Sequence, residues 1–269
     1  MAAIVTLSAV FTYRHAAGPP PSMRPATALA AEFTQLENSL HAKMGIAVGA
    51  VGNGQALMMW GDWHEGPAWS TIKVPLVIAA FRQANPPHAN PPHVTGVMKA
   101  AITESDNAAA ESLWAQLGDP TAAAQRVQQV LQENDDPTVV ESRRLRPEFT
   151  AFGQTTWSLT NQIRFVAGAF CDSANDPIFH LMGQVEPNQT WGIGDIPGTE
   201  FKGGWGPSPS GKYLVRQIGV LTTPAGKVAV AIAAEPGSGS FDDGTRDLGE
   251  VAKWLIAHLG ALPAGQCGR

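Results

Sequence analysis

The sequence predicts an α+β fold, an α/β sandwich in which an antiparallel sheet is flanked by N- and C-terminal helices and joined to an all-helical lobe. Strand-like runs lie near both ends of the chain, at 46–60 and 213–234, and helical patterns fill the stretch between them. Amphipathic segments also open and close the folded part. Strands from both ends with helices between them favour one sheet with an inserted helical lobe, and the cleft between the sheet-containing lobe and the helical lobe is the natural place for a site.

The first helix is predicted from Thr27, because Leu29, Phe33, Leu36 and Leu40 recur at helical steps. Two strands follow at 46–51 and 55–60, joined by Gly52-Asn53-Gly54, whose residues tolerate a tight hairpin. The helical patterns of the lobe lie at 70–83, 97–117, 121–131 and 158–170.

A second hairpin is predicted from the Val- and Ile-rich runs 213–221 and 227–234, which are separated by a turn composition. The last helix is predicted over 247–259, with Asp242, Asp243 and Thr245 as candidate N-caps. The tandem Ala-Asn-Pro-Pro-His repeat at 84–93 is predicted to be a loop, because proline pairs forbid a continuous helix.

Composition narrows the class of protein. The chain has 269 residues, of which 44% are hydrophobic and 15% charged, so it can bury a core of its own. Its formal net charge is −5 and its basic residues are scattered, which argues against a nucleic-acid partner. We expect a monomer.

Residues 1–26 are predicted to form a leader and a flexible stem. Residues 1–11 form an apolar run that resembles the core of a signal peptide and is too short to span a bilayer, and three consecutive prolines follow at 19–21. We therefore expect an exported protein that contacts a membrane only through this leader. One folded domain is expected over 27–262, and a C-terminal tail over 263–269.

The two cysteines, Cys171 and Cys267, lack the spacing of a metal or redox motif, so no metal and no cofactor is expected. Either they form one disulfide that ties down the C-terminal tail, or they are two unrelated thiols.

Ser70-Thr-Ile-Lys73 can place a nucleophile beside a base. The motif begins a predicted helix, where a spacing of three residues puts hydroxyl and amine on neighbouring positions. A desolvated lysine can lose its proton and accept that of a serine, and a helix N-terminus offers free N–H groups to an oxyanion. Composition alone supplies roughly 0.3 such pairs by chance, so this motif is weak by itself.

Ser105-Asp106-Asn107 is a stronger signal, because composition supplies it only roughly 0.02 times by chance. It lies at a bend between two helical stretches, where Asp106 could also act as an N-cap. Lys202-Gly203-Gly204 follows later in a glycine-rich segment, where missing side chains allow a substrate to approach a strand.

These three elements, in this order, are the signature of penicillin-recognising serine enzymes. From about residue 28 to 260 the chain resembles class A serine β-lactamases and their penicillin-binding relatives. The resemblance rests on the three motifs, on Trp191-Gly-Ile before Lys202, and on the terminal helices and hairpins.

The resemblance implies a role for each motif residue. Ser70 would be the acylated nucleophile, Lys73 its proton acceptor and Ser105 a proton relay to the leaving nitrogen. The substrate-binding residues would be Asn107, Lys202, Gly203, Gly204, Trp205 and Arg216. Among these, the backbone N–H of Trp205 would join that of Ser70 in the oxyanion hole, and Lys202 and Arg216 would hold the substrate carboxylate.

The chain departs from the family at several positions. Gly203 replaces a hydroxyl residue that helps bind the carboxylate, and the segment between Lys73 and Ser105 is short. The family's deacylating glutamate corresponds by position to Glu141, fourteen residues before Thr155, but no Leu-Asn follows it, and Glu148 is the other candidate. Pro75 removes a donor, though only in the opening turns of its helix.

The sequence thus favours a serine hydrolase that forms an acyl-serine on a β-lactam or a peptidoglycan-like acyl substrate and then hydrolyses it. One alternative is a penicillin-binding or D-alanyl peptidase-like protein with slow deacylation. A non-catalytic envelope binding protein of the same fold is the other.

Overall fold

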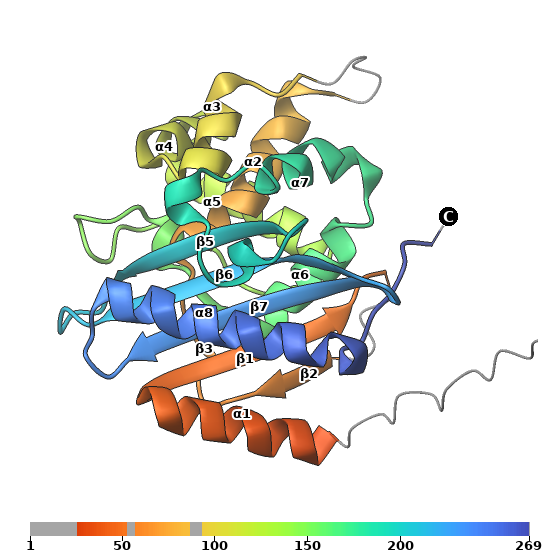
Figure 1. The fold of residues 1–269 in the computed structure, drawn as a ribbon. Helices are drawn as coiled ribbons and strands as arrows, with labels where there is room; N and C mark the ends of the chain where they lie inside the picture. The colour runs from red at the N-terminus through yellow and green to blue at the C-terminus, as the bar shows by residue number, and fades with distance from the viewer. Residues whose placement is uncertain (1–25, 53–56, 87–92, 269) are drawn as a thin grey trace, which may run out of the picture.

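The computed structural model describes residues 26–52, 57–86 and 93–268 (Figure 1). The predicted leader and stem, the Asn53-Gly54 turn and the centre of the Pro-Pro-His repeat lie outside these residues.

Five antiparallel strands form the main sheet in the order β2-β1-β7-β6-β5. The strands are β1 (Ala42–Ala50), β2 (Leu57–Trp60), β5 (Glu200–Pro207), β6 (Tyr213–Thr223) and β7 (Gly226–Pro236). β1 pairs with β7, so that Ile46 lies opposite Ile232, and the two ends of the chain meet in the middle of the sheet. The short strands β3 (Glu65–Pro67) and β4 (Thr156–Ser158) form a separate ladder.

The two faces of the sheet carry side chains of different size. In β7, the alternate residues Val228, Val230 and Ile232 belong to the core beneath α1 (Ala26–Leu40) and α8 (Phe241–His258). The residues between them are Ala229, Ala231 and Ala233, which belong to the core shared with α6 (Leu159–Ala169). The helices are accordingly divided, with α1 and α8 on one side of the sheet and the helical lobe on the other (Figure 1).

The lobe surrounds α2 (Lys73–Ala84), which is buried over residues 73–81. Its other helices are α3 (Gly96–Lys99), α4 (Asn107–Gln116), α5 (Pro120–Gln132) and α7 (Asp176–Met182). A 3₁₀ turn, η1 (Trp69–Ile72), leads into α2, so Pro75 falls in the first turn of the α-helix, where its missing N–H costs little.

The predicted fold class is confirmed, with two local corrections. The helical pattern 97–117 is interrupted by a π-helical turn, Ala100–Glu104, and by Ser105. The last helix begins earlier than predicted, at Phe241, where the Ser240 side chain accepts a hydrogen bond from the Asp243 N–H at 3.1 Å. Asp242 and Asp243 therefore lie inside the first turn rather than capping it. Their negative charges interact favourably with the helix dipole at this end.

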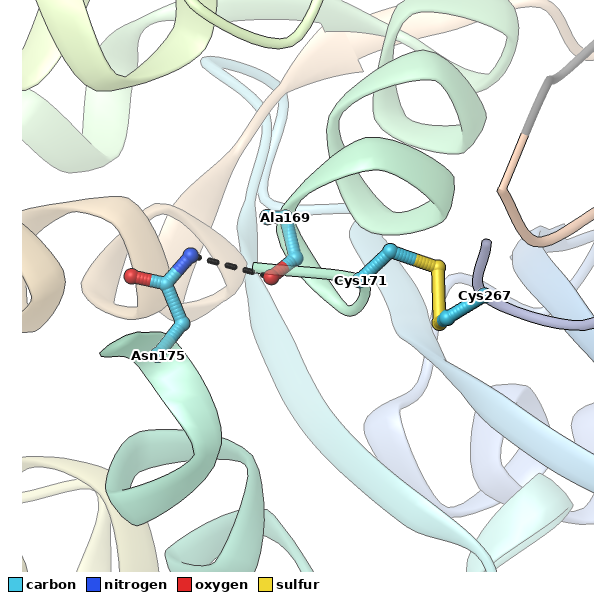
Figure 2. Close-up of a disulfide and its surroundings, with 4 residues drawn as sticks. All are labelled: Ala169, Cys171, Asn175 and Cys267. Atoms are coloured by element: carbon cyan, nitrogen blue, oxygen red, sulfur yellow. Dashed lines mark hydrogen bonds between the residues drawn. A yellow bond between two sulfur atoms is a disulfide. The ribbon is translucent and has the colours of Figure 1, made fainter. Parts of the chain in front are cut away.

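Cys171 and Cys267 form a disulfide, which decides between the two sequence alternatives (Figure 2). Cys171 follows α6, and Cys267 lies in the tail, where Gly265 also exchanges two backbone hydrogen bonds with Lys227 of β7. The tail is therefore fixed to the sheet next to α6. Across the described residues, no helix is both long and apolar enough to cross a membrane.

Candidate active site

Ser70 lies in η1, directly against strand β5. A Cβ atom at Gly204 would lie only 2.8 Å from the Ser70 nitrogen, so glycine is required there for the strand to approach the serine. Trp69, just before Ser70, has a left-handed φ of 49°. A tryptophan adopts this conformation only where its surroundings impose it, and such strain gathers at functional sites.

Lys73 is fully buried at the start of α2. Its Nζ donates to the Ser105 carbonyl oxygen at 2.6 Å and to Asn107 Oδ1 at 2.7 Å. Burial lowers the pKa of Lys73 to about 7, against the opposing charges of Asp106 and Glu111. A large fraction of Lys73 is therefore neutral at physiological pH.

Ser105 lies in the break between the π-helical turn and α4, with a left-handed φ of 56°. Asp106 then caps α4 by accepting from the Ala109 N–H, so the predicted capping role is confirmed. The break directs the Ser105 hydroxyl at two lysines, with Lys202 Nζ at 2.8 Å and Lys73 Nζ at 3.5 Å.

Lys202 is completely buried in β5 and also donates to the Gly203 carbonyl oxygen at 2.9 Å. Burial, together with the charge of Lys73, lowers the pKa of Lys202 well below its usual value. The structure thus joins Lys73, Ser105, Asn107 and Lys202 in one hydrogen-bonded group.

A pocket of about 420 Å³ opens beside this group. Ser70, Asn107 and Trp205, which the sequence predicted as site residues, all line it. Much of its wall is aromatic, from Trp69, Phe149, Phe152, Trp205 and Tyr213.

The pocket contains Glu148 and not Glu141. The Glu141 carboxylate is held by its near neighbour, with Arg143 Nε at 3.0 Å and Arg143 N–H at 2.8 Å, and these bonds keep the pKa of Glu141 below its usual value. The Glu141 carboxylate, which the sequence suggested for the site, therefore lies outside this pocket, whereas the other candidate, Glu148, lines it. Glu141 and Thr155 are in contact, as their spacing suggested, because the Glu141 N–H donates to Thr155 Oγ1. That contact fixes the backbone of Glu141 and not its carboxylate.

Arg216 does not reach the pocket, although the sequence suggested it as a carboxylate ligand. It is fully buried beneath the sheet, with its guanidinium 4.9 Å from the ring centre of Trp63. Its NH1 donates to the carbonyl oxygens of Gly66 and Pro67, at 3.0 and 2.9 Å. Burial lowers the pKa of Arg216 to about 9, which still leaves it charged at neutral pH.

The second terminal nitrogen of Arg216 extends this contact toward the nucleophile. It donates to the Trp157 carbonyl oxygen at 3.0 Å and to Gln162 Oε1 at 2.6 Å. Gln162 Nε2 in turn donates to Thr71 Oγ1 at 3.1 Å, next to Ser70. Arg216 therefore anchors β3, β4 and the nucleophile turn to one another from inside the protein.

The Trp191 ring lies close to the position of a side chain at residue 203. A Cβ atom there would lie 3.2 Å from the indole, a tight contact that the ring would have to relieve by a small shift.

Sequence reasoning missed Glu111, which lines the pocket and accepts a hydrogen bond from Arg144 NH2 at 2.7 Å. A signal was present, because Glu111 lies four residues after Asn107 and so shares its face of α4. Within residues 26–52, 57–86 and 93–268, no three or more His, Cys, Asp or Glu side chains are grouped to hold a metal ion.

The fold is that of the class A β-lactamases. The structure matches a class A β-lactamase from Mycobacterium abscessus with a TM-score of 0.66 and 16% identity, over 87% of this chain and 100% of the other. A β-lactamase from Streptosporangium roseum gives 0.67 and 16%, over 88% and 100%. The TLA-1 extended-spectrum β-lactamase gives 0.70 and 16%, over 88% and 99%.

Sequence comparison adds nothing to this assignment. No family model matches the chain, and no curated protein matches it.

Proposed function

We propose that this protein is a serine hydrolase that acts through an acyl-serine intermediate, with β-lactams as the leading substrate class. The observation that carries the proposal is the Ser105 hydroxyl held between two buried lysines, in a group that reaches the Ser70 pocket through Asn107. Such a group can move a proton from a serine nucleophile to a leaving nitrogen.

In the proposed acylation step, neutral Lys73 is the base. Its two short hydrogen bonds, to Ser105 O and Asn107 Oδ1, use both N–H groups of a neutral amine and leave the lone pair free. As Ser70 Oγ attacks the carbonyl carbon, its proton passes to Lys73. The C–N bond then breaks, and the nitrogen receives a proton through the Ser105 hydroxyl.

Deacylation requires a base that activates water against the ester bond to Ser70. Glu148 is the carboxylate we assign to this step, because it lines the pocket. Its carboxylate is also bound by Arg146 at 3.1 Å, and that ion pair favours a second candidate, a penicillin-binding protein in which the adduct persists.

Intact-mass measurement after exposure to a penicillin tests the proposal. A transient adduct is expected for a β-lactamase and a persistent adduct for a penicillin-binding protein. The adduct should be absent in Ser70→Ala and unchanged in the matched control Ser173→Ala, whose serine lies on the exposed turn η4. No adduct in the wild type would overturn the proposal.

A second pair of variants tests the base. General-base assistance contributes about 10² to 10⁴-fold, so Glu148→Gln should lengthen the adduct lifetime by at least about a hundredfold. Glu141→Gln should leave the lifetime unchanged. Equal lifetimes in both variants and the wild type would show that neither carboxylate acts on water.

We also propose that the protein works in an oxidising compartment, because disulfides such as Cys171–Cys267 persist there and are rare in the cytosol. Fractionation of the native host followed by thiol labelling tests this. A reduced pair in the cytosolic fraction would contradict it.

A further inference from the structure

The groups expected to bind a substrate carboxylate are Lys202, residue 203 and Arg216, and none of them is available to do so in the structure. Lys202 is fully buried, and its ammonium already contacts Ser105 Oγ and the Gly203 carbonyl oxygen. Burial and the neighbouring Lys73 also disfavour its charged form. The first expected anchor therefore serves Ser105.

The other two expected anchors are lost for different reasons. At Gly203 there is no hydroxyl, and even a Cβ atom there would lie only 3.2 Å from the Trp191 ring. Arg216 turns inward, where its terminal nitrogens donate only to protein oxygens of Gly66, Pro67, Trp157 and Gln162.

The charged side chains at the pocket form internal pairs. Arg144 is bound to Glu111, and Glu148 is bound to Arg146, whose guanidinium also lies 4.3 Å from the ring centre of Phe149. Each pair is neutral as a whole. Among the described residues that line the pocket, the only cation is Arg144, and a new anion there would have to compete with Glu111.

Part of the remaining wall is aromatic and is suited to an apolar group. Trp69 and Phe149 meet edge to face at 5.0 Å, and Trp205 and Tyr213 both pack against Phe241, at 5.3 and 6.0 Å. Aromatic walls held rigid in this way favour aromatic ligands, through buried area and ring contacts.

We propose that this pocket selects acyl compounds that carry an aryl side chain, and that it needs no carboxylate on the substrate. This proposal rests on the proposed function only where it assumes that the bound acyl compound reacts with Ser70. The preference for an aryl side chain concerns binding, which can be measured without the reaction.

Binding to the Ser70→Ala protein gives that separate measurement. A penicillin with a phenylacetyl side chain and its methyl ester are each titrated while tryptophan fluorescence is followed, since Trp69 and Trp205 line the pocket. An anchored carboxylate would form charge-assisted hydrogen bonds, whose loss costs about tenfold to a hundredfold in affinity. We expect acid and ester to bind within about threefold of each other.

The aryl preference is tested with methyl esters that carry phenylacetyl or acetyl side chains. Burying an aromatic ring contributes about 1.5–3 kcal/mol, which corresponds to about tenfold or more in favour of phenylacetyl. Phe149→Leu should reduce this preference. Phe170→Leu, whose ring packs against Phe179 away from the pocket residues, is the matched control and should leave it unchanged.

The outcomes separate this proposal from the proposed function. A tenfold preference for the free acid, no preference for phenylacetyl, or no binding of any probe would overturn the recognition proposal. The predicted binding without any Ser70 adduct in the wild type would uphold recognition and overturn the hydrolase. An adduct together with strong preference for the free acid would do the reverse.

Discussion

Lys73 binds Ser105 and Asn107, and in the proposed mechanism it also accepts a proton from Ser70. Its pKa of about 7 makes these tasks pH-dependent. Below pH 7 the ammonium has no lone pair, so the rate of acylation should fall about tenfold per pH unit, and above pH 7 it should level off.

Stopped-flow measurement of adduct formation between pH 5 and 9 checks this dependence. Lys73→Arg keeps a charge and its donors but cannot be neutralised, so it should remain almost inactive across the whole range. A rate that is flat between pH 5 and 7 would exclude Lys73 as the base.

The three motifs contain side chains that the structure brings together, including Lys202, which donates to Ser105 Oγ across 97 positions, whereas the isolated Arg216 was placed wrongly. Ser70 and Lys73, and Ser105 and Asn107, each lie within one turn or bend, so local geometry fixes their relation. Arg216 was misplaced because its spacing from Lys227 gives a position along the sheet, whereas its partners come from β3, β4 and α6. Only the tertiary fold determines what lies beneath that strand.

At the scale of elements, the anchoring of β3, β4 and η1 by Arg216 predicts a stability effect. Arg216→Met leaves several buried oxygens without a donor, at about 1–3 kcal/mol each, partly offset because a buried charge is removed. We expect the free energy of unfolding in urea to fall by about 2–4 kcal/mol.

The matched control is Arg164→Met, whose exposed guanidinium contacts Asn161 at 3.3 Å and should change stability by less than about 0.5 kcal/mol. The ratio of KM values for an acid substrate and its ester should also be unchanged in Arg216→Met. A selective rise in KM for the acid would restore Arg216 as a carboxylate ligand.

Helix α8 contains a buried carboxylate, Asp247, whose ionisation lowers the stability of the folded protein. Asp247 is 3% exposed, and its Oδ2 has no hydrogen-bond partner among the described residues. Burial raises the pKa of Asp247 from 3.8 to about 6, against Arg246 and with help from Asp243 and Glu250. The folded protein therefore holds this proton more tightly than the unfolded chain, and stability falls as the pH rises from about 4 to 6.

Each unit of difference between the folded and unfolded pKa corresponds to roughly 1.4 kcal/mol of folding free energy. Asp247→Asn should therefore stabilise the protein at pH 7 by up to about 3 kcal/mol. At pH 4 the variant should resemble the wild type. Urea unfolding at both pH values checks this, and equal changes at the two would contradict the raised pKa.

The predicted elements were those with a long and regular pattern. α1, α5, α6 and the β6–β7 hairpin all have a clear period in their side chains and were found within a few residues. β3 and β4 were missed because each has only three residues, and α7 because it has only seven. The break at Ser105 could be located, but its π-helical approach has no sequence signature.

For the molecule as a whole, the disulfide is the main covalent restraint. It joins residues 96 positions apart, and closing a loop of about this length removes unfolded-state entropy worth up to about 4–5 kcal/mol. Cys171→Ser with Cys267→Ser should lower the free energy of unfolding by about 2–4 kcal/mol.

The comparison is made in urea with the oxidised wild type, and the wild type in reducing agent should match the double variant. Acylation of Ser70 should persist in the variant, because neither cysteine lines the active-site pocket. An unchanged unfolding midpoint would show that the disulfide contributes no stability.

The pairing of β1 with β7 also determines how late during synthesis the centre of the sheet can form. β1 ends at Ala50, whereas its central partner β7 begins only at Gly226. At about 5–20 residues per second, a ribosome needs roughly 10–40 s to make the intervening chain. Throughout that interval the apolar edge of β1, with Ile46 and Val48, has no partner from β7 and can pair with other chains. Nascent chains arrested before Gly226 should therefore depend on chaperones, and the released full-length chain should not.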